Sequence, residues 1–165
     1  MTIPALTMYH PNGKGTGSAI MIELHPAHDD TAGSIMATIA TQLTIGDRLG
    51  AVPVYPRFDW EGAITVKLDF TDISKMLQVF RGECESIEDG RGLFHKSTRG
   101  TTKIILRHIV EPINGYMLEV YRKTDSEDSN ARIFLSPYEA LGLATAIESS
   151  MGVICFGIPM VIPNV

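Results

Sequence analysis

The sequence predicts an α+β fold in which a series of strands is closed by one helix, and in which this order occurs twice. Three observations lead to this prediction. Several segments alternate between apolar and polar residues, two segments have helical apolar spacing, and their capping residues, Thr71 and Ser136, lie 65 positions apart. Successive strands before each helix favour an α+β fold over a doubly wound one. The 165 residues fit one domain with an internal duplication.

The first half begins with a segment that we expect to be a flexible N-terminal arm, residues 1–17, because prolines and glycines interrupt it. Residues 18–25 and 34–41 alternate between apolar and polar side chains, and both are predicted strands. Residues 46–56 are predicted to be a connection, with a short strand at 51–55.

The clearest strand pattern lies at residues 63–70, and a helix is predicted to follow directly. Thr71 is a suitable N-cap, and Asp72 fits the first turn, where a negative charge is favourable. Gly82 is predicted to end the helix. The apolar residues between these ends recur at helical spacing: Ile73, Met76, Leu77 and Phe80.

The second half repeats this order. After the acidic segment 83–92, strands are predicted at 101–110 and 116–123, with the hairpin signal Asn114-Gly115 between them. Polar residues at 124–130 predict an exposed loop, and 131–135 is a further predicted strand.

The second helix is predicted from its start signal. Ser136 and Glu139 have the spacing of a capping box, and Pro137 occupies the first helical position. Gly152 is expected to end this helix. The apolar stretch 153–163 contains prolines and is expected to be extended. We therefore expect a binding domain over residues 18–157 and an apolar C-terminal tail over 158–165.

Motifs that would indicate an enzyme or a cofactor are incomplete. The glycine-rich segment 13–17 lacks the spacing and the preceding strand of a phosphate-binding loop. His25 and His28, followed by Asp29 and Asp30, have no defined third metal ligand. No nucleophile motif occurs either. We expect a non-enzymatic protein with no catalytic residue, no metal and no cofactor.

Composition points to a reducing compartment. Two cysteines do not make a disulfide framework. The first residues lack the pattern of a secretory signal, and no apolar run approaches the roughly 20 residues that span a bilayer. We expect a cytoplasmic protein without a membrane partner, located in the host cytoplasm or nucleoid if a bacteriophage encodes it.

The charge is unevenly distributed. The net charge is -5, which argues against coating of nucleic acid by global attraction. Residues 91–123 nevertheless carry seven basic and two acidic residues, a net charge of +5, whereas the rest of the chain carries -10. Lys103 and Arg107 share one face of their predicted strand, and Tyr121 and Lys123 share one face of the next. Cations and an aromatic ring on neighbouring strands suit single-stranded nucleic acid, although an ordinary solvated sheet face has the same pattern.

Several segments, in this order, resemble the Whirly family of single-stranded DNA-binding proteins, which are related in fold to the coactivator PC4. The resemblance covers roughly two thirds of the chain. Its segments are Phe58-Asp59-Trp60-Glu61, Leu68 to Ser74, Cys84-Glu85, Leu93-Phe94-His95-Lys96, Lys103 to Leu106, Gly115 to Val120 and Phe134-Leu135-Ser136. The segment from Gly13 to Ala19 is similar to the family's Lys-Gly-Lys-Ala-Ala stretch, but retains only Lys14.

The resemblance implies two four-stranded antiparallel sheets, each followed by a helix, as an internal ββββα repeat in a propeller-like tetramer. It also implies binding of single-stranded DNA across the sheets with little sequence specificity, in replication, repair or transcription. We expect phosphates to contact Lys67, Lys96, Lys103, Arg107 and Lys123, bases to stack on Trp60 and Tyr121, and Lys14 to clamp the strand. A core position for Trp60 is the alternative.

Two other functions stay open: RNA binding by the same fold, and an oligomeric scaffold for protein partners. We expect a homo-oligomer, a tetramer first and a dimer second, with the apolar tail in its interface. The missing transit peptide and the apolar ending, which is unlike that of the plant proteins, favour a bacterial or bacteriophage origin.

Overall fold

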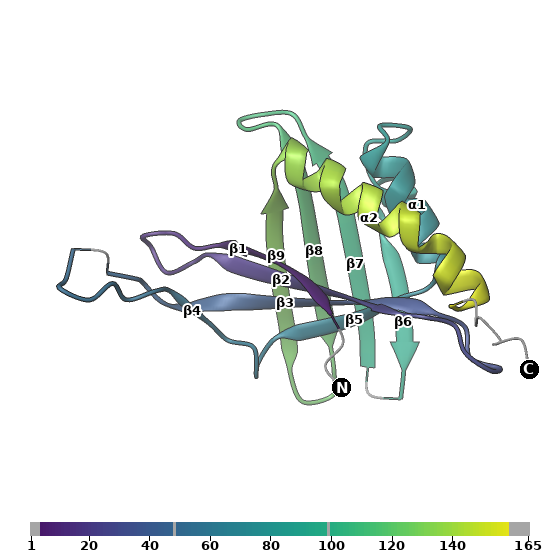
Figure 1. Cartoon of the computed structure of the whole chain (residues 1–165), viewed down its shortest axis with the longest axis horizontal. Coiled ribbons are helices and arrows are strands. Elements are labelled where there is room, and N and C mark those ends of the chain that lie inside the picture. Colours follow the sequence, from purple (N-terminus) through teal and green to yellow (C-terminus); the bar gives the residue numbers. More distant parts are fainter. Residues whose placement is uncertain (1–3, 48, 99, 159–165) are drawn as a thin grey trace, which may run out of the picture.

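Two antiparallel sheets cross each other, and two helices pack beside them (Figure 1). The computed structural model describes residues 4–47, 49–98 and 100–158. Each sheet is followed in the chain by a helix. The α+β class, the two sheets and the repeated order of strands and helix are as predicted.

The first sheet is four strands wide. β1 (Ala5–His10), β2 (Ser18–His25) and β3 (Ser34–Thr44) pair antiparallel in this order. The fourth position is shared by two short strands, because β4 (Arg57–Phe58) pairs with the end of β3 and β5 (Ile64–Leu68) pairs with its beginning. Alternate residues of each strand face the core, which gives the sheet one apolar and one outer face.

The flexible arm expected over residues 1–17 was wrong for the stretch that forms β1. Leu6 and Met8 lie opposite the apolar residues Ile22 and Ile20 of β2, so the strand contributes to the apolar face. The turn from β1 to β2 is held by Gln42, whose side chain accepts hydrogen bonds from the backbone N–H groups of Asn12 and Gly17.

The strand expected at 51–55 is also absent from the structure as described. In this loop Asp47 and Val54 form an isolated bridge through two backbone hydrogen bonds of 2.9 and 2.7 Å. The pairing that continues the sheet occurs later, at Arg57 and Phe58.

The second sheet has the order β6-β7-β8-β9. Its strands are β6 (Leu93–Ser97), β7 (Gly100–Ile109), β8 (Gly115–Lys123) and β9 (Asp128–Leu135). The exposed loop predicted at 124–130 is shorter than expected, because β9 already begins at Asp128. The hydroxyl of Thr124 closes this turn by donating to the carbonyl of Glu127.

The first helix, α1 (Phe70–Phe80), begins earlier than predicted. Asp69, rather than Thr71, is its N-cap: the Asp69 carboxylate accepts from the Asp72 N–H at 2.9 Å, and the Asp72 carboxylate accepts from the Asp69 N–H. Two carboxylates thus form a reciprocal capping box. A short 3₁₀ helix, η1 (Ile87–Gly90), follows in the acidic segment.

The second helix, α2 (Pro137–Phe156), has the predicted capping box of Ser136 and Glu139. Its predicted end at Gly152 was wrong, since the helix continues to Phe156 and ends at Gly157, whose positive φ of 75° suits glycine. The expected extended tail is therefore helical at 153–156, and residues 159–165 lie outside the described residues.

A histidine ties each helix start to a strand of the other half of the chain. His10 at the end of β1 contacts the Glu139 carboxylate of α2 at 2.7 Å. His95 of β6 contacts the Asp72 carboxylate of α1 at 2.9 Å. The first strand of each half thus supports the capping box of the other half's helix.

α2 has apolar residues on every side and is only partly covered. Within the described residues, α2 is the one helix that is long and apolar enough to cross a membrane, with a mean hydropathy of 1.3 over an 18-residue window. From the sequence we expected no apolar run of this length. Leu143 and Ile147 are buried in the core, so one side of α2 packs against the rest of the fold. Leu141 and Phe156 on the same helix are 69 % and 89 % exposed.

Candidate functional site

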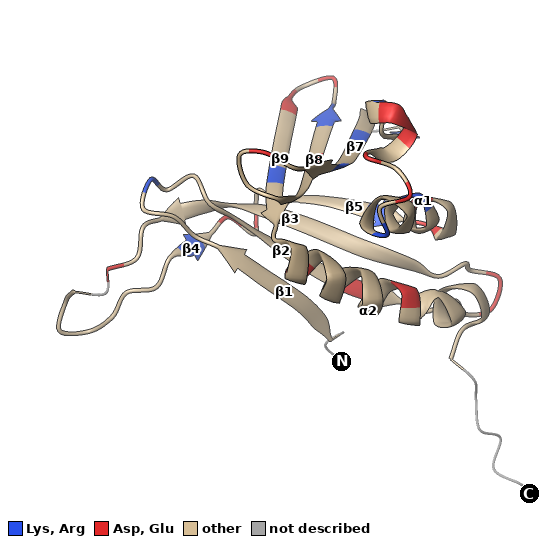
Figure 2. Ribbon diagram, turned by 90° about the horizontal axis from the view of Figure 1, so that it is seen from above, with Lys and Arg blue, Asp and Glu red and all other residues tan. Residues whose placement is uncertain are grey.

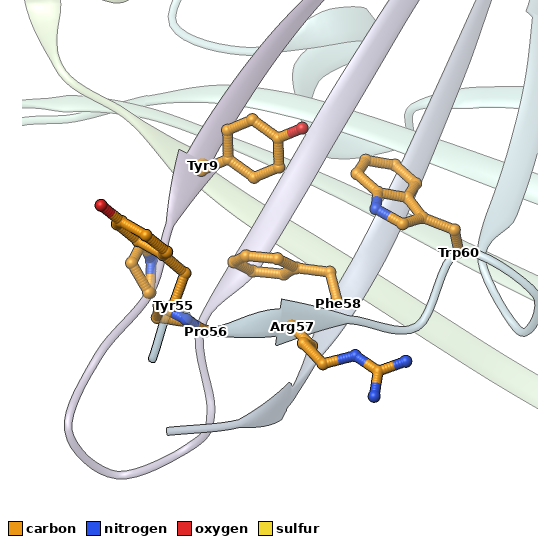
Figure 3. A pocket seen from close by; sticks show the side chains of 7 residues that line it. Tyr9, Tyr55, Pro56, Arg57, Phe58 and Trp60 are labelled. Carbon is orange, nitrogen blue, oxygen red and sulfur yellow. The ribbon is translucent and has the colours of Figure 1, made fainter. Parts of the chain in front are cut away.

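Aromatic side chains gather at one end of the first sheet (Figure 3). The ring centroid of Tyr9 lies 5.5 Å from that of Phe58 and 6.4 Å from that of Trp60, the latter nearly edge-on at 89°. Together with Pro11, Tyr55, Pro56 and Arg57, they line a pocket of about 610 Å³. Tyr9 is 57 % exposed and Trp60 is 37 % exposed, so both rings are open to a ligand.

Strand pairing and a tight turn position the rings of this aromatic pocket. Tyr9 of β1 lies opposite the fully buried Ala19 of β2. Trp60 is held just after β4, where its N–H donates to the Phe58 carbonyl at 3.1 Å. The Asp59 carboxylate accepts from the Gly62 N–H and closes the turn into β5.

A second hollow continues from the aromatic pocket along the outer face of the first sheet. It has a volume of about 540 Å³ and shares Tyr9 and Trp60 with the aromatic pocket. Its remaining lining residues are Thr7, Met21, Glu23, His25, Met36, Thr38 and Thr65. We call the two hollows together the outer groove. Its chemistry changes from aromatic at one end to polar at the other.

The outer face of the second sheet carries cations. Lys103 lies opposite Tyr121 on β8 and opposite Phe94 on β6, and its Nζ is 5.4 Å from the centre of the Phe94 ring. Thr101 of β7 separates Lys96 and Lys123, its neighbours on the two flanking strands. Figure 2 shows basic positions on β7, β8 and β9. The alternation predicted for these strands is thus observed.

Arg107 shares this face but is already paired. Its guanidinium lies 3.1 Å from the carboxylate of Glu119, which is 8 % exposed. The Tyr121 hydroxyl donates to the same carboxylate at 3.2 Å. Burial and the charge of Glu119 raise the pKa of Tyr121 above its ordinary value, so this ring stays neutral at any physiological pH. Arg107 is therefore a weaker phosphate ligand than Lys103.

The predicted site residues lie in three places. Five lie on the outer face of the second sheet: Lys96, Lys103, Arg107, Tyr121 and Lys123. Trp60 and Lys67 belong to the outer face of the first sheet, and Lys14 is in the exposed turn between β1 and β2. The structure brings the first five together, and the binding role of all eight stays a prediction.

Sequence reasoning missed most of the aromatic pocket. Tyr9 was assigned to the arm, Tyr55 was assigned to the connection over residues 46–56, and Arg57 was not named as a site residue. A signal was available, since residues 55–60 hold three aromatic side chains and one arginine. Their convergence with Tyr9 depends on the pairing of β1 with β2, which the local pattern does not show.

Two crossed antiparallel sheets, each followed by a helix, define the Whirly type of α+β fold. The chain is similar in structure to WHY1 from Arabidopsis thaliana, with a TM-score of 0.74 and 14 % identity over 94 % of this chain and 87 % of that one. It is also similar to the plant transcriptional regulator PBF-2, with a TM-score of 0.67 and 17 % identity over 93 % of this chain and 83 % of the other.

A guide-RNA-binding protein complex bound to its RNA also shares the fold, with a TM-score of 0.62 and 15 % identity over 91 % of this chain and 90 % of that chain. No protein-family model matches the sequence, and none of the curated proteins matches it. At these identities, the likenesses establish the fold.

Proposed function

We propose that the protein binds single-stranded DNA with little sequence specificity and catalyses no reaction, in support of replication, repair or transcription. The observation that carries this proposal is the aromatic pocket, where the exposed rings of Tyr9 and Trp60 line one hollow together with Arg57. Unpaired bases stack on such rings, with about 1–3 kcal/mol for each stacked base, and a neighbouring cation attracts the phosphates.

The lysines of the second sheet support the same proposal. Lys96, Lys103 and Lys123 are grouped on one face of a protein whose net charge is -5. A local cationic face attracts a polyanion even where the global charge repels it. Stacking on the first sheet and phosphate contacts on the second sheet would bind a strand irrespective of its sequence.

RNA is the second candidate ligand, because one structure with this fold is described as a guide-RNA-binding complex bound to RNA. Bases stack equally well whichever sugar they carry, so the aromatic pocket itself does not exclude RNA. Competition between DNA and RNA strands of equal sequence distinguishes the two candidates.

We also propose that the protein is a homo-oligomer, a tetramer first and a dimer second, assembled through α2. The support is the exposed apolar side of this helix, including Leu141 and Phe156. Exposed apolar patches of this kind mark interfaces.

Fluorescence anisotropy with labelled oligo-dT tests the binding proposal. We expect tighter binding to the single strand than to a duplex, and weakening with salt at a slope of about -0.7 per neutralised phosphate. Quenching of Trp60, the single tryptophan, would report stacking. Equal affinity for the duplex, or affinity that is independent of salt, would contradict the proposal.

Matched variants locate the stacking surface. Tyr9→Ala should weaken binding about tenfold or more through the loss of a stacking ring. Phe70→Ala removes a similarly exposed ring on α1, outside the pocket, and should leave the affinity unchanged. An equal loss in the two variants would argue against the aromatic pocket as the base-binding surface.

A further inference from the structure

The polar end of the outer groove contains a carboxylate in an unexpected place. Glu23 of β2 is half-buried on the outer face and lines the groove. Within the described residues, its carboxylate has no hydrogen-bond or ion-pair partner. An unpaired carboxylate repels phosphates, so a groove that receives a polyanion is expected to use this group for another contact.

His25 lies two residues further along the same strand and lines the same groove. Its Nε2 atom is shielded from solvent and has no hydrogen-bond partner within the described residues. Buried polar nitrogen atoms are rarely left unsatisfied, because the loss of hydration costs free energy. Because Nε2 itself is not accessible from the groove, a ligand there would contact the other ring nitrogen of His25, Nδ1, for which no hydrogen bond is found within the described residues.

The surroundings of this pair limit the ligand. Met36 of β3 separates Glu23 from Lys67 of β5 in one row across the sheet, which leaves Lys67 free to meet a phosphate beside the groove. The aromatic pocket lies at the other end of the groove, so a base stacked there has neighbouring bases near Glu23.

We propose that Glu23 and His25 make this end of the groove selective for guanine, an inference that rests on the proposed function. The Watson–Crick edges of bases are free in a single strand and are read by side-chain hydrogen bonds. Guanine presents two adjacent donors there, N1–H and the N2 amino group, which match the two oxygens of a carboxylate. Its O6 accepts a hydrogen bond, and the imidazole of His25 is the nearby donor.

The other bases fit this pair less well. Cytosine and adenine each offer one amino donor beside a ring nitrogen lone pair that repels a carboxylate. Thymine and uracil offer one N–H between two carbonyl oxygens. Binding through stacking and phosphates thus stays general, and one position along the strand prefers guanine.

The test compares labelled oligo-dT with the same strand carrying isolated guanines, which cannot form quadruplexes. We expect about tenfold tighter binding of the guanine-containing strand, as for a good bidentate base contact. Hypoxanthine in place of guanine removes the N2 amino group and should abolish most of this preference. This comparison uses the unaltered protein.

Glu23→Gln should bring the affinity ratio of the two strands close to one. Glu127→Gln, which removes the same charge in the β8–β9 turn, should change both affinities alike and keep the ratio. Equal affinities of the unaltered protein for the two strands would overturn the guanine proposal and leave the proposed function standing. If Glu23→Gln left the affinity ratio of the two strands unchanged, the guanine proposal would also be overturned. If the unaltered protein bound neither strand, the proposed function itself would be refuted.

Discussion

Lys103 and Arg107 carry the same charge on the same face of β7, but their neighbours differ. Lys103 Nζ lies over the Phe94 ring, whereas Arg107 neutralises the buried carboxylate of Glu119. Lys103→Ala should weaken binding to all strands alike and reduce the salt slope by about 0.7. Anisotropy titrations over a series of salt concentrations measure both effects.

Arg107→Ala should act on stability instead. It leaves Glu119 buried without its cation, at a cost of roughly 1–2 kcal/mol, because the half-exposed arginine is partly screened by solvent. Thermal unfolding measures this cost, and adding Glu119→Gln should restore most of the stability. If Arg107→Ala instead reduced the salt slope as much as Lys103→Ala without loss of stability, Arg107 would be a free phosphate ligand.

For single residues, the sequence predicted which face of a strand a side chain occupies better than it predicted which other side chain it contacts. Side chains alternate along a strand, so the common face of Lys103 and Arg107 follows from their spacing. Glu119 is on the same face of β8 and could have been predicted by the same argument. Its pairing with Arg107 depends on the register between the two strands, which is set by the whole hairpin.

Glu139 connects the start of α2 to β1. Burial raises its pKa, but hydrogen bonds from Ser136 and the contact with His10 outweigh this effect, so the pKa lies below its ordinary value. A lowered carboxylate pKa contributes stability that is present above the unfolded-state pKa and is lost as the pH falls through the folded-state pKa. Glu139→Gln should therefore cost about 0.5–1 kcal/mol at neutral pH and little under acidic conditions.

Chemical denaturation of the unaltered protein and of Glu139→Gln, from neutral to acidic pH, measures the difference between their unfolding free energies. Glu148→Gln, an exposed carboxylate on the same helix, serves as the control and should show a small, nearly pH-independent change. A difference between the unaltered protein and Glu139→Gln that stayed constant from neutral to acidic pH would contradict the assigned role of the carboxylate.

The elements themselves were largely predictable where local chemistry defines them. Ser136-Pro137-x-Glu139 has few readings other than a helix start, and it was confirmed. Asp69 was missed because Thr71 is an equally suitable N-cap residue. Which of the two caps the helix depends on where β5 ends in the folded structure. β1, β4 and β6 were missed because each is short and depends on pairing with a longer strand.

For the whole molecule, the uncovered side of α2 makes the strongest prediction. Leu141→Lys places a charge on this side and should reduce the mass of the assembly from a tetramer or dimer towards a monomer, as measured by light scattering. Val110→Lys changes an equally exposed residue in the β7–β8 loop, and it should leave the mass unchanged. A monomeric unaltered protein would contradict the assembly proposal, and equal masses of the two variants would exclude α2 from the interface.

The two histidine contacts at the helix starts have a consequence for how the two halves of the chain fold. In each half a first strand carries an aromatic residue followed by histidine, Tyr9-His10 and Phe94-His95, and the histidine reaches the helix of the opposite half. Reciprocal contacts of this kind are the mark of a twofold interface, in which the same residue crosses in both directions. The two halves of the chain thus contact each other as the two subunits of a homodimer would, and separate peptides for the two halves should recover their fold only when mixed.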